Sequence, residues 1–137
     1  MINLQPTKCN ICGGKVIYTS NSMIYGKEYG SGKMYYCTIC EAYVGTHKPS
    51  PTEALGILAN EEMRELKMKC HYIFDQQWKN ISNSKKRHFA RVNAYKELAK
   101  ALGIRLEECH FGYFDMKMLQ KAYMILNNDK EKRESNG

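Results

Sequence analysis

Four cysteines form two identical pairs in the first third of this 137-residue chain. Cys9 and Cys12 enclose two residues, as do Cys37 and Cys40, and 24 residues separate the two pairs. A CxxC turn lets both sulfurs reach one ion, and two such turns joined by a β-hairpin create a tetrahedral all-thiolate site, the zinc-ribbon arrangement. We therefore predict one structural Zn²⁺ at these four cysteines, with iron as the competing ion for the same ligands.

The same cysteines could instead be redox pairs or disulfides. Redox CxxC pairs start a helix within a βαβ pattern, which neither pair does. Residues 1–6 contain neither the charged nor the apolar part of a secretion signal, so we expect a cytoplasmic chain that is not secreted. His47 could replace one thiolate, although four cysteines already complete the set. An ion with four protein ligands has no open position and should stabilise the fold rather than catalyse.

Two histidines and two aspartates are the candidate groups for catalysis. His71 and Asp75 lie one helical turn apart, whereas His110 and Asp115 lie in or beside an irregular segment. Together they could act as general acids and bases or hold a hard divalent metal. The alternative is that Asp115 caps a helix and the others make partly buried polar contacts. No other catalytic motif accompanies them, which favours a binding role over an enzymatic one.

The two remaining cysteines each precede a histidine, as Cys70-His71 and Cys109-His110. Adjacent residues on a helix point about 100° apart, so such a pair does not easily bind one ion. Cys70 also fits an apolar stripe. We expect both cysteines to be buried thiols rather than ligands of a second zinc.

Positive charge is concentrated in one segment of a chain whose formal charge is +7 and whose pI is about 9.1. Residues 79–105 contain one acid, Glu97, and the following basic residues: Lys79, Lys85, Lys86, Arg87, Arg91, Lys96, Lys100 and Arg105. The predicted phosphate contacts to DNA or RNA are Lys85, Lys86, Arg87 and Arg91. Positive charge at a helix start opposes the macrodipole, so it does not serve stability there. A merely solvated helix face is the alternative.

Two regions with different periodicity must position these groups. Residues 1–51 contain β-type runs at 15–19 and 33–36 around a glycine-rich loop, and residues 52–137 follow helical spacing. We expect an α+β fold, in which the zinc ribbon of short antiparallel hairpins packs on about three helices as one compact unit. No apolar run is long enough to span a bilayer.

Three helices are expected in the second region. Asn60 should cap the first, whose apolar stripe extends to Trp78. The second should span residues 85–102, end at Gly103 and bury Phe89 on its apolar face. Asp115 should cap the third, with a frayed tail from Asn127. The small residue and glycine at 99 and 103 also fit a helix-turn-helix, although a glycine at 112 interrupts the second helix of that motif.

The chain resembles a phage- and prophage-encoded zinc-finger-containing domain family. The matching segments are residues 9–14, 36–48, 55–60, 64–71, 74–78, 91–104 and 109–115. The resemblance implies a phage or prophage origin, a location in the bacterial host cell, and a zinc ribbon fused to a helical part, but no reaction. It also draws attention to polar and aromatic residues inside those segments: His47, His71, Asp75, Trp78, Arg91 and His110.

These observations predict a zinc-stabilised binding module for nucleic acid or for a nucleic-acid-handling protein. A tyrosine or phenylalanine near the glycine-rich loop could add stacking contacts. One alternative is a small hydrolase or nuclease that uses His71, Asp75 and His110. The other is a protein-interaction adaptor that acts on a host or phage protein.

Overall fold

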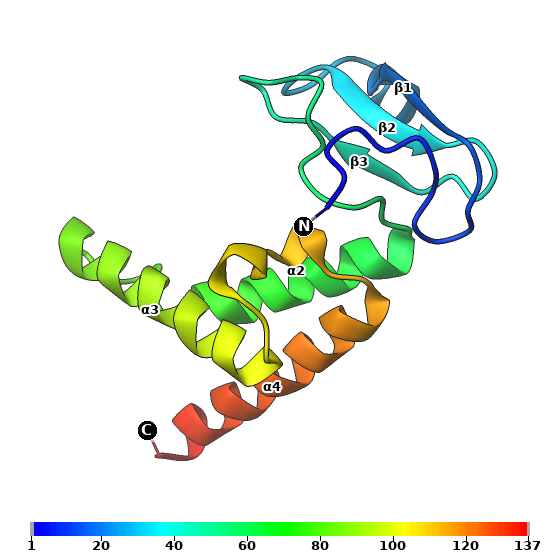
Figure 1. Cartoon of the computed structure of the whole chain (residues 1–137). Coiled ribbons are helices and arrows are strands. Elements are labelled where there is room, and N and C mark those ends of the chain that lie inside the picture. Colours follow the sequence, from blue (N-terminus) through cyan, green and yellow to red (C-terminus); the bar gives the residue numbers. More distant parts are fainter. Residues whose placement is uncertain (1, 137) are drawn as a thin grey trace. The chain divides into compact units, whose positions relative to one another are not determined.

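The computed structural model describes residues 2–136, which form two compact units divided after Arg64 (Figure 1). The fold is α+β, as predicted, with strands in the first unit and helices in the second. No helix within the described residues combines the length and apolarity needed to cross a membrane. The expected boundary at residue 51 and the packing of both parts as one unit stay predictions.

The N-terminal unit is built on a three-stranded antiparallel sheet in the order β1-β2-β3. Strand β1 (Val16–Ser20) pairs with β2 (Lys33–Cys37), which pairs with β3 (Tyr43–Gly45). A four-residue helix, α1 (Ser22–Tyr25), lies in the β1–β2 connection. The two runs of β-type residues therefore form the predicted hairpin, and β3 adds a third strand that the sequence analysis did not identify.

Residues 53–59 follow the free edge of β3, and the first turn of the next helix completes the N-terminal unit. Tyr43 and Ala59 exchange two backbone hydrogen bonds, and Leu55 N–H donates to Gly45 O. Arg64 lies over the Tyr43 ring at 4.2 Å and donates to Ala59 O. Burial of Ala54 and Leu58 then joins this segment to the sheet core, which contains Cys9, Val16, Tyr35, Cys37, Ala42 and Val44.

The C-terminal unit contains most of helix α2 (Glu61–Asp75), followed by α3 (Ser84–Leu102), two 3₁₀ turns and α4 (Met116–Asn136). The turns are η1 (Leu106–Glu108) and η2 (Phe111–Tyr113), so no helix-turn-helix follows α3. Its core holds Phe74, Leu98, Phe111 and Leu119. Phe74 contacts the Tyr95 ring at 4.5 Å and the Phe111 ring at 5.6 Å.

Three of the predicted helix ends are confirmed by their capping residues. Asn60 Oδ1 accepts from Met63 N–H, and Asp115 Oδ1 accepts from Met118 N–H, both at 2.9 Å. Gly103 ends α3 in the left-handed conformation, with φ of 71°. Each capping residue acts on backbone groups only a few positions away, so these helix ends could be predicted from the sequence.

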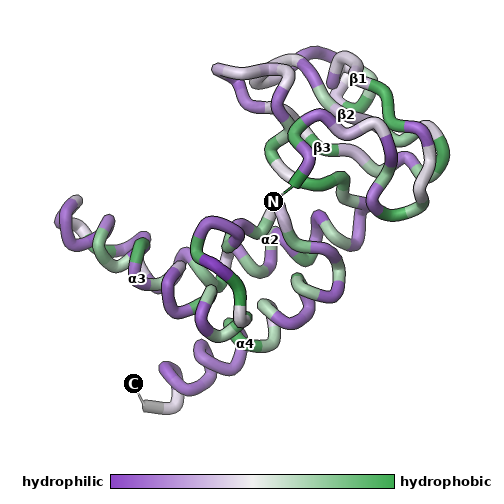
Figure 2. The backbone as a smooth tube through the Cα atoms, viewed as in Figure 1, coloured by the Kyte–Doolittle hydropathy of each residue, from purple (hydrophilic) through white to green (hydrophobic). Residues whose placement is uncertain are grey.

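Three expectations about the helices were wrong. Trp78 lies beyond the end of α2, in the turn that leads to α3. Phe89 is 77% exposed instead of buried, because the residues of α3 that are buried all lie between Ala94 and Leu102. Helix α4 continues to Asn136 although its last turns are strongly hydrophilic (Figure 2); Leu126 is its last core residue.

Candidate metal centre and basic helix face

The four predicted ligands meet at one point in the N-terminal unit. All four sulfur atoms lie within 4.8 Å of one another, and within residues 2–136 they are the one group of cysteine, histidine and carboxylate ligands arranged this way. The Sγ atoms of Cys9 and Cys40 are 3.7 Å apart, and those of Cys12 and Cys37 are 3.5 Å apart. A tetrahedron with Zn–S bonds of about 2.3 Å has edges of about 3.8 Å. The group therefore fits one structural zinc ion.

Backbone N–H groups point at the sulfurs in both CxxC turns. Ile11 N–H lies 3.3 Å from the Cys9 sulfur, and Ile39 N–H lies 3.4 Å from the Cys37 sulfur. Gly14 N–H approaches the Cys12 sulfur at 3.3 Å. These N–H groups hydrogen-bond to the sulfurs and so support them as metal ligands.

The pKa values of two of these thiols move in opposite directions. Burial acts to raise the pKa of Cys37, but the N–H groups of Cys40 and Ile39 and the neighbouring thiols lower it to about 6. For Cys40 the Ala42 N–H acts to lower the pKa, whereas burial and the three other thiols raise it to about 12. Four thiolates this close repel one another, so full ionisation requires a cation among them.

Each CxxC turn closes through a residue in the left-handed region four positions after its first cysteine. These residues are Gly13, with φ of 77°, and Glu41, with φ of 66°. Next to the first turn, a Cβ on Gly14 would lie 2.8 Å from the Cβ of Ile39 in the second turn. A glycine at position 14 is thus what lets the two turns approach each other.

Asn10 anchors the first turn to a distant part of the unit. Its amide nitrogen donates to Leu58 O at 3.0 Å, and its amide oxygen accepts from Leu58 N–H at 2.9 Å. This contact could not be predicted from the sequence, because its partners lie 48 positions apart and a single asparagine gives no pairing signal.

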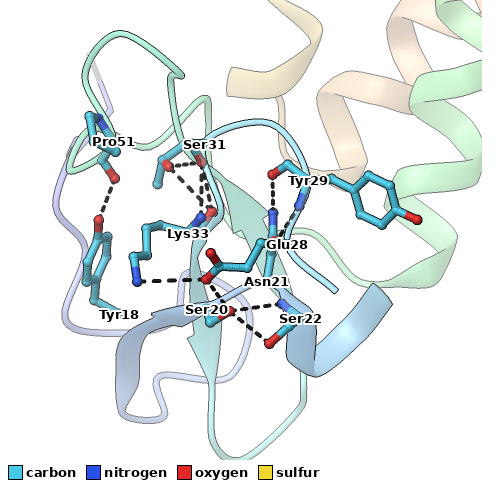
Figure 3. Close-up of polar contacts among 10 residues, drawn as sticks. Tyr18, Ser20, Asn21, Ser22, Glu28, Tyr29, Ser31, Lys33 and Pro51 are labelled. Atoms are coloured by element: carbon cyan, nitrogen blue, oxygen red, sulfur yellow. Dashed lines mark hydrogen bonds and ion pairs between the residues drawn. The ribbon is translucent and has the colours of Figure 1, made fainter. Parts of the chain in front are cut away.

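The hairpin tip between β1 and β2 is ordered by side-chain contacts (Figure 3). Asn21 donates to Tyr29 O and accepts from Tyr29 N–H, at 2.8 and 3.2 Å. Glu28 accepts from the Ser20 hydroxyl and pairs with Lys33 at 4.0 Å. The Tyr25 and Tyr29 rings, each 51% exposed, contact each other edge to face at 5.7 Å. These contacts hold the glycine-rich loop, and its two tyrosine rings are exposed.

The other metal-ligand candidates lie outside the four-cysteine group. His47 is exposed and is not among its members. Cys70 is fully buried and its thiol donates to Leu119 O at 3.7 Å. Burial raises the pKa of Cys70 and that of Cys109 to about 11. The prediction that Cys70 and Cys109 are buried thiols is confirmed.

The four candidate catalytic residues lie in the C-terminal unit, where three of them have different contact partners. The His71 ring meets the Phe111 ring at 4.6 Å, and the His110 ring meets the Tyr113 ring at the same distance. Desolvation lowers the pKa of His71, against the opposing effect of Asp75. Asp115 uses its carboxylate to cap α4. No three of these side chains form a metal-ligand group within the described residues.

The basic residues of α3 occupy two different faces. With 100° per residue, six side chains fall within about 100° of arc. The arc is opposite three of the four buried residues of α3, Ala94, Leu98 and Leu102, and the fourth, Ala99, lies about 40° outside it. We call this the outer face; its members are Lys85, Lys86, Phe89, Asn93, Lys96 and Lys100. All six are exposed. Within residues 2–136, none of its lysines has a carboxylate within 4.0 Å.

Arg87 and Arg91 point the other way, toward the turn that precedes α3. Arg87 Nη1 donates to Ile81 O at 3.0 Å. The Arg91 guanidinium lies over the rings of Trp78 and Tyr95, at 5.4 and 4.9 Å from their centroids. Of the four predicted phosphate contacts, the structure therefore places Lys85 and Lys86 on the outer face and uses both arginines to hold the start of α3.

Comparisons with known proteins agree with this architecture. No curated protein and no solved structure matches the chain. A family model described as a zinc-finger-containing domain matches residues 5–129, which include all four ligands and the whole of α2 and α3. The ribbon geometry, the closed four-thiolate site and this match lead to one conclusion: the chain belongs to the zinc-finger-containing domain family.

Proposed function

We propose that this protein is a nucleic-acid-binding module in which zinc stabilises the N-terminal unit and the outer face of α3 contacts phosphates. The observation that carries the proposal is a row of exposed lysines without acidic partners on one side of a helix. These four lysines have no carboxylate within 4.0 Å among residues 2–136. Lysines that neutralise phosphates release the cations condensed on the nucleic acid, which is the main source of non-specific affinity.

Two further observations support a binding role for this face. Residues 84–93 contribute no buried side chain, so this half of α3 is not needed to close the core. Phe89 is exposed in the middle of the lysines, where it gains nothing from the core. A phage or prophage origin and a place in the host-cell cytoplasm stay predictions that accompany this role.

Salt-dependent binding tests the proposal. For four phosphate contacts, affinity for a labelled 20-bp duplex or 20-nucleotide strand should fall about 100-fold between 50 and 200 mM salt. Fluorescence anisotropy would measure it. The variant Lys85→Ala/Lys86→Ala should bind more weakly and lose about two units of the salt slope. The control Lys117→Ala/Lys132→Ala removes the same charge from exposed positions of α4 and should bind as the parent does. Absent or salt-insensitive binding would contradict the proposal.

A further inference from the structure

We propose that the outer face of α3 binds double-stranded DNA in the major groove, with Phe89 and Asn93 against the base edges. The inference rests on the proposed function and deepens it by naming the form of nucleic acid. It follows from the shape of the helix, from the placement of its cations around Phe89, and from the chemistry of its two uncharged side chains, those of Phe89 and Asn93.

The outer face belongs to one helix and is therefore convex. Helix α3 has 19 residues, about 28 Å, and its first half extends beyond the buried core of the C-terminal unit (Figure 1). A helix with side chains is about 10–12 Å across, which matches the roughly 12 Å width of the B-DNA major groove. Single strands are bound in concave basic channels, and the major groove of A-form RNA is too narrow to admit side chains.

The lysines lie on both sides of a central line through Phe89. Relative to Phe89, Lys85 is turned about 40° one way and Lys86 about 60° the other. Lys96 and Lys100, about 10 and 16 Å further along the helix, lie about 20° to either side of the same line. A helix seated in the groove with Phe89 toward its floor would thus direct lysines at the phosphates of both walls.

Phe89 and Asn93, the two uncharged residues of the face, lie about 40° apart and can distinguish base pairs. Asn93, one turn after Phe89, is exposed, and within residues 2–136 its amide has no hydrogen-bond partner. An asparagine amide pairs with N6 and N7 of adenine, and an apolar side chain contacts the thymine methyl group. The face should therefore prefer A·T pairs to G·C pairs.

The test compares four ligands of equal length: an A·T-rich DNA duplex, a G·C-rich DNA duplex, an RNA duplex and a DNA single strand. The parent protein should bind the A·T-rich duplex most tightly. Asn93→Ala should lose about 5- to 150-fold of the preference for it over the G·C-rich duplex, the range for one bidentate base contact. Replacing thymine by uracil should weaken binding of the parent but not of Phe89→Ala. Both residues are exposed, and circular dichroism would show that the variants keep the parent's fold.

Two results would overturn the inference while leaving the proposed function intact. One is equal or tighter binding of the single strand or the RNA duplex. The other is a strong effect of Lys85→Ala/Lys86→Ala with no loss of A·T preference in Phe89→Ala and Asn93→Ala. If the parent bound none of the four ligands at low salt, both the inference and the proposed function would fall.

Discussion

The two units of this protein are stabilised by different means. The N-terminal unit has a three-stranded sheet, and its core includes two of the metal-binding cysteines. Its four cysteine sulfurs lie within 4.8 Å of one another, and the free energy of zinc binding there contributes to the free energy of folding. The C-terminal unit buries phenylalanine, leucine and two unligated thiols among its helices. Metal removal should therefore affect the N-terminal unit, and core truncation should affect the C-terminal unit.

The largest expected effect is that of removing a ligand. Cys37→Ser should abolish stoichiometric zinc binding and unfold the N-terminal unit, because binding of a structural zinc contributes about 10–16 kcal/mol to the folding of small zinc domains. Metal analysis of the purified variant and its near-ultraviolet circular dichroism would measure this. The matched control is Cys109→Ala, which removes a buried thiol outside the site and should keep one zinc per chain. Equal metal content in both variants would contradict the ligand assignment.

Truncating the core of the other unit should have the next largest effect. Phe74 is fully buried and contacts two aromatic rings, so Phe74→Ala should cost about 3–5 kcal/mol of the free energy of unfolding. Urea denaturation followed by circular dichroism at 222 nm would measure it. The zinc content should stay at one per chain. A variant that lost its zinc together with its helices would show that the two units do not respond separately.

A smaller effect is expected where the two CxxC turns approach each other. Gly14→Ala places a Cβ 2.8 Å from the Cβ of Ile39, and the displacement should cost about 1–3 kcal/mol. Competition with a chromophoric chelator would detect the weaker zinc affinity. Gly45→Ala is the control, because its new Cβ would meet Leu55 at an ordinary 3.5 Å. Similar zinc affinities for the two variants would refute the close approach.

The smallest effect concerns the pH dependence of the C-terminal unit. Desolvation lowers the pKa of His71 in the folded state, so the unfolded chain binds the proton more readily. Stability from this residue is therefore present above about pH 6.5 and is lost as the pH falls below it. Asp75 opposes the shift, whereas Lys67 and Arg91 act in its direction. Urea titrations at pH 5.5 and 7.5 should show a smaller difference for His71→Gln than for the parent, and an unchanged difference would exclude this residue as the source.

Local patterns were sufficient to predict the metal centre and the three helix ends at Asn60, Gly103 and Asp115. The spacing of Cys9, Cys12, Cys37 and Cys40 specifies two turns that bring sulfurs together, and a cap such as Asn60 acts within three residues of itself. Long-range features were not accessible in this way. The Asn10–Leu58 contact joins residues 48 positions apart.

The misplacement of Phe89 has a definite physical cause. Helical periodicity identifies which side of α3 is apolar but not how far along the helix the neighbouring elements extend. In the structure burial begins only at Ala94, so Phe89 is exposed and Arg91 packs on Trp78 instead of lying free. Because of this boundary, Phe89, which was predicted to be a core residue, lies within the proposed binding face.

The central claim is that one zinc ion stabilises the N-terminal unit and not the C-terminal one. Hydrogen exchange of the whole protein before and after chelation tests this claim most directly. Mass spectrometry of peptides would report the two units in one sample. After chelation, amides of residues 9–45 should lose protection, whereas amides of residues 94–126 should keep it, because the core of the C-terminal unit contains no ligand. Unchanged protection in residues 9–45, or an equal loss in both regions, would contradict the account.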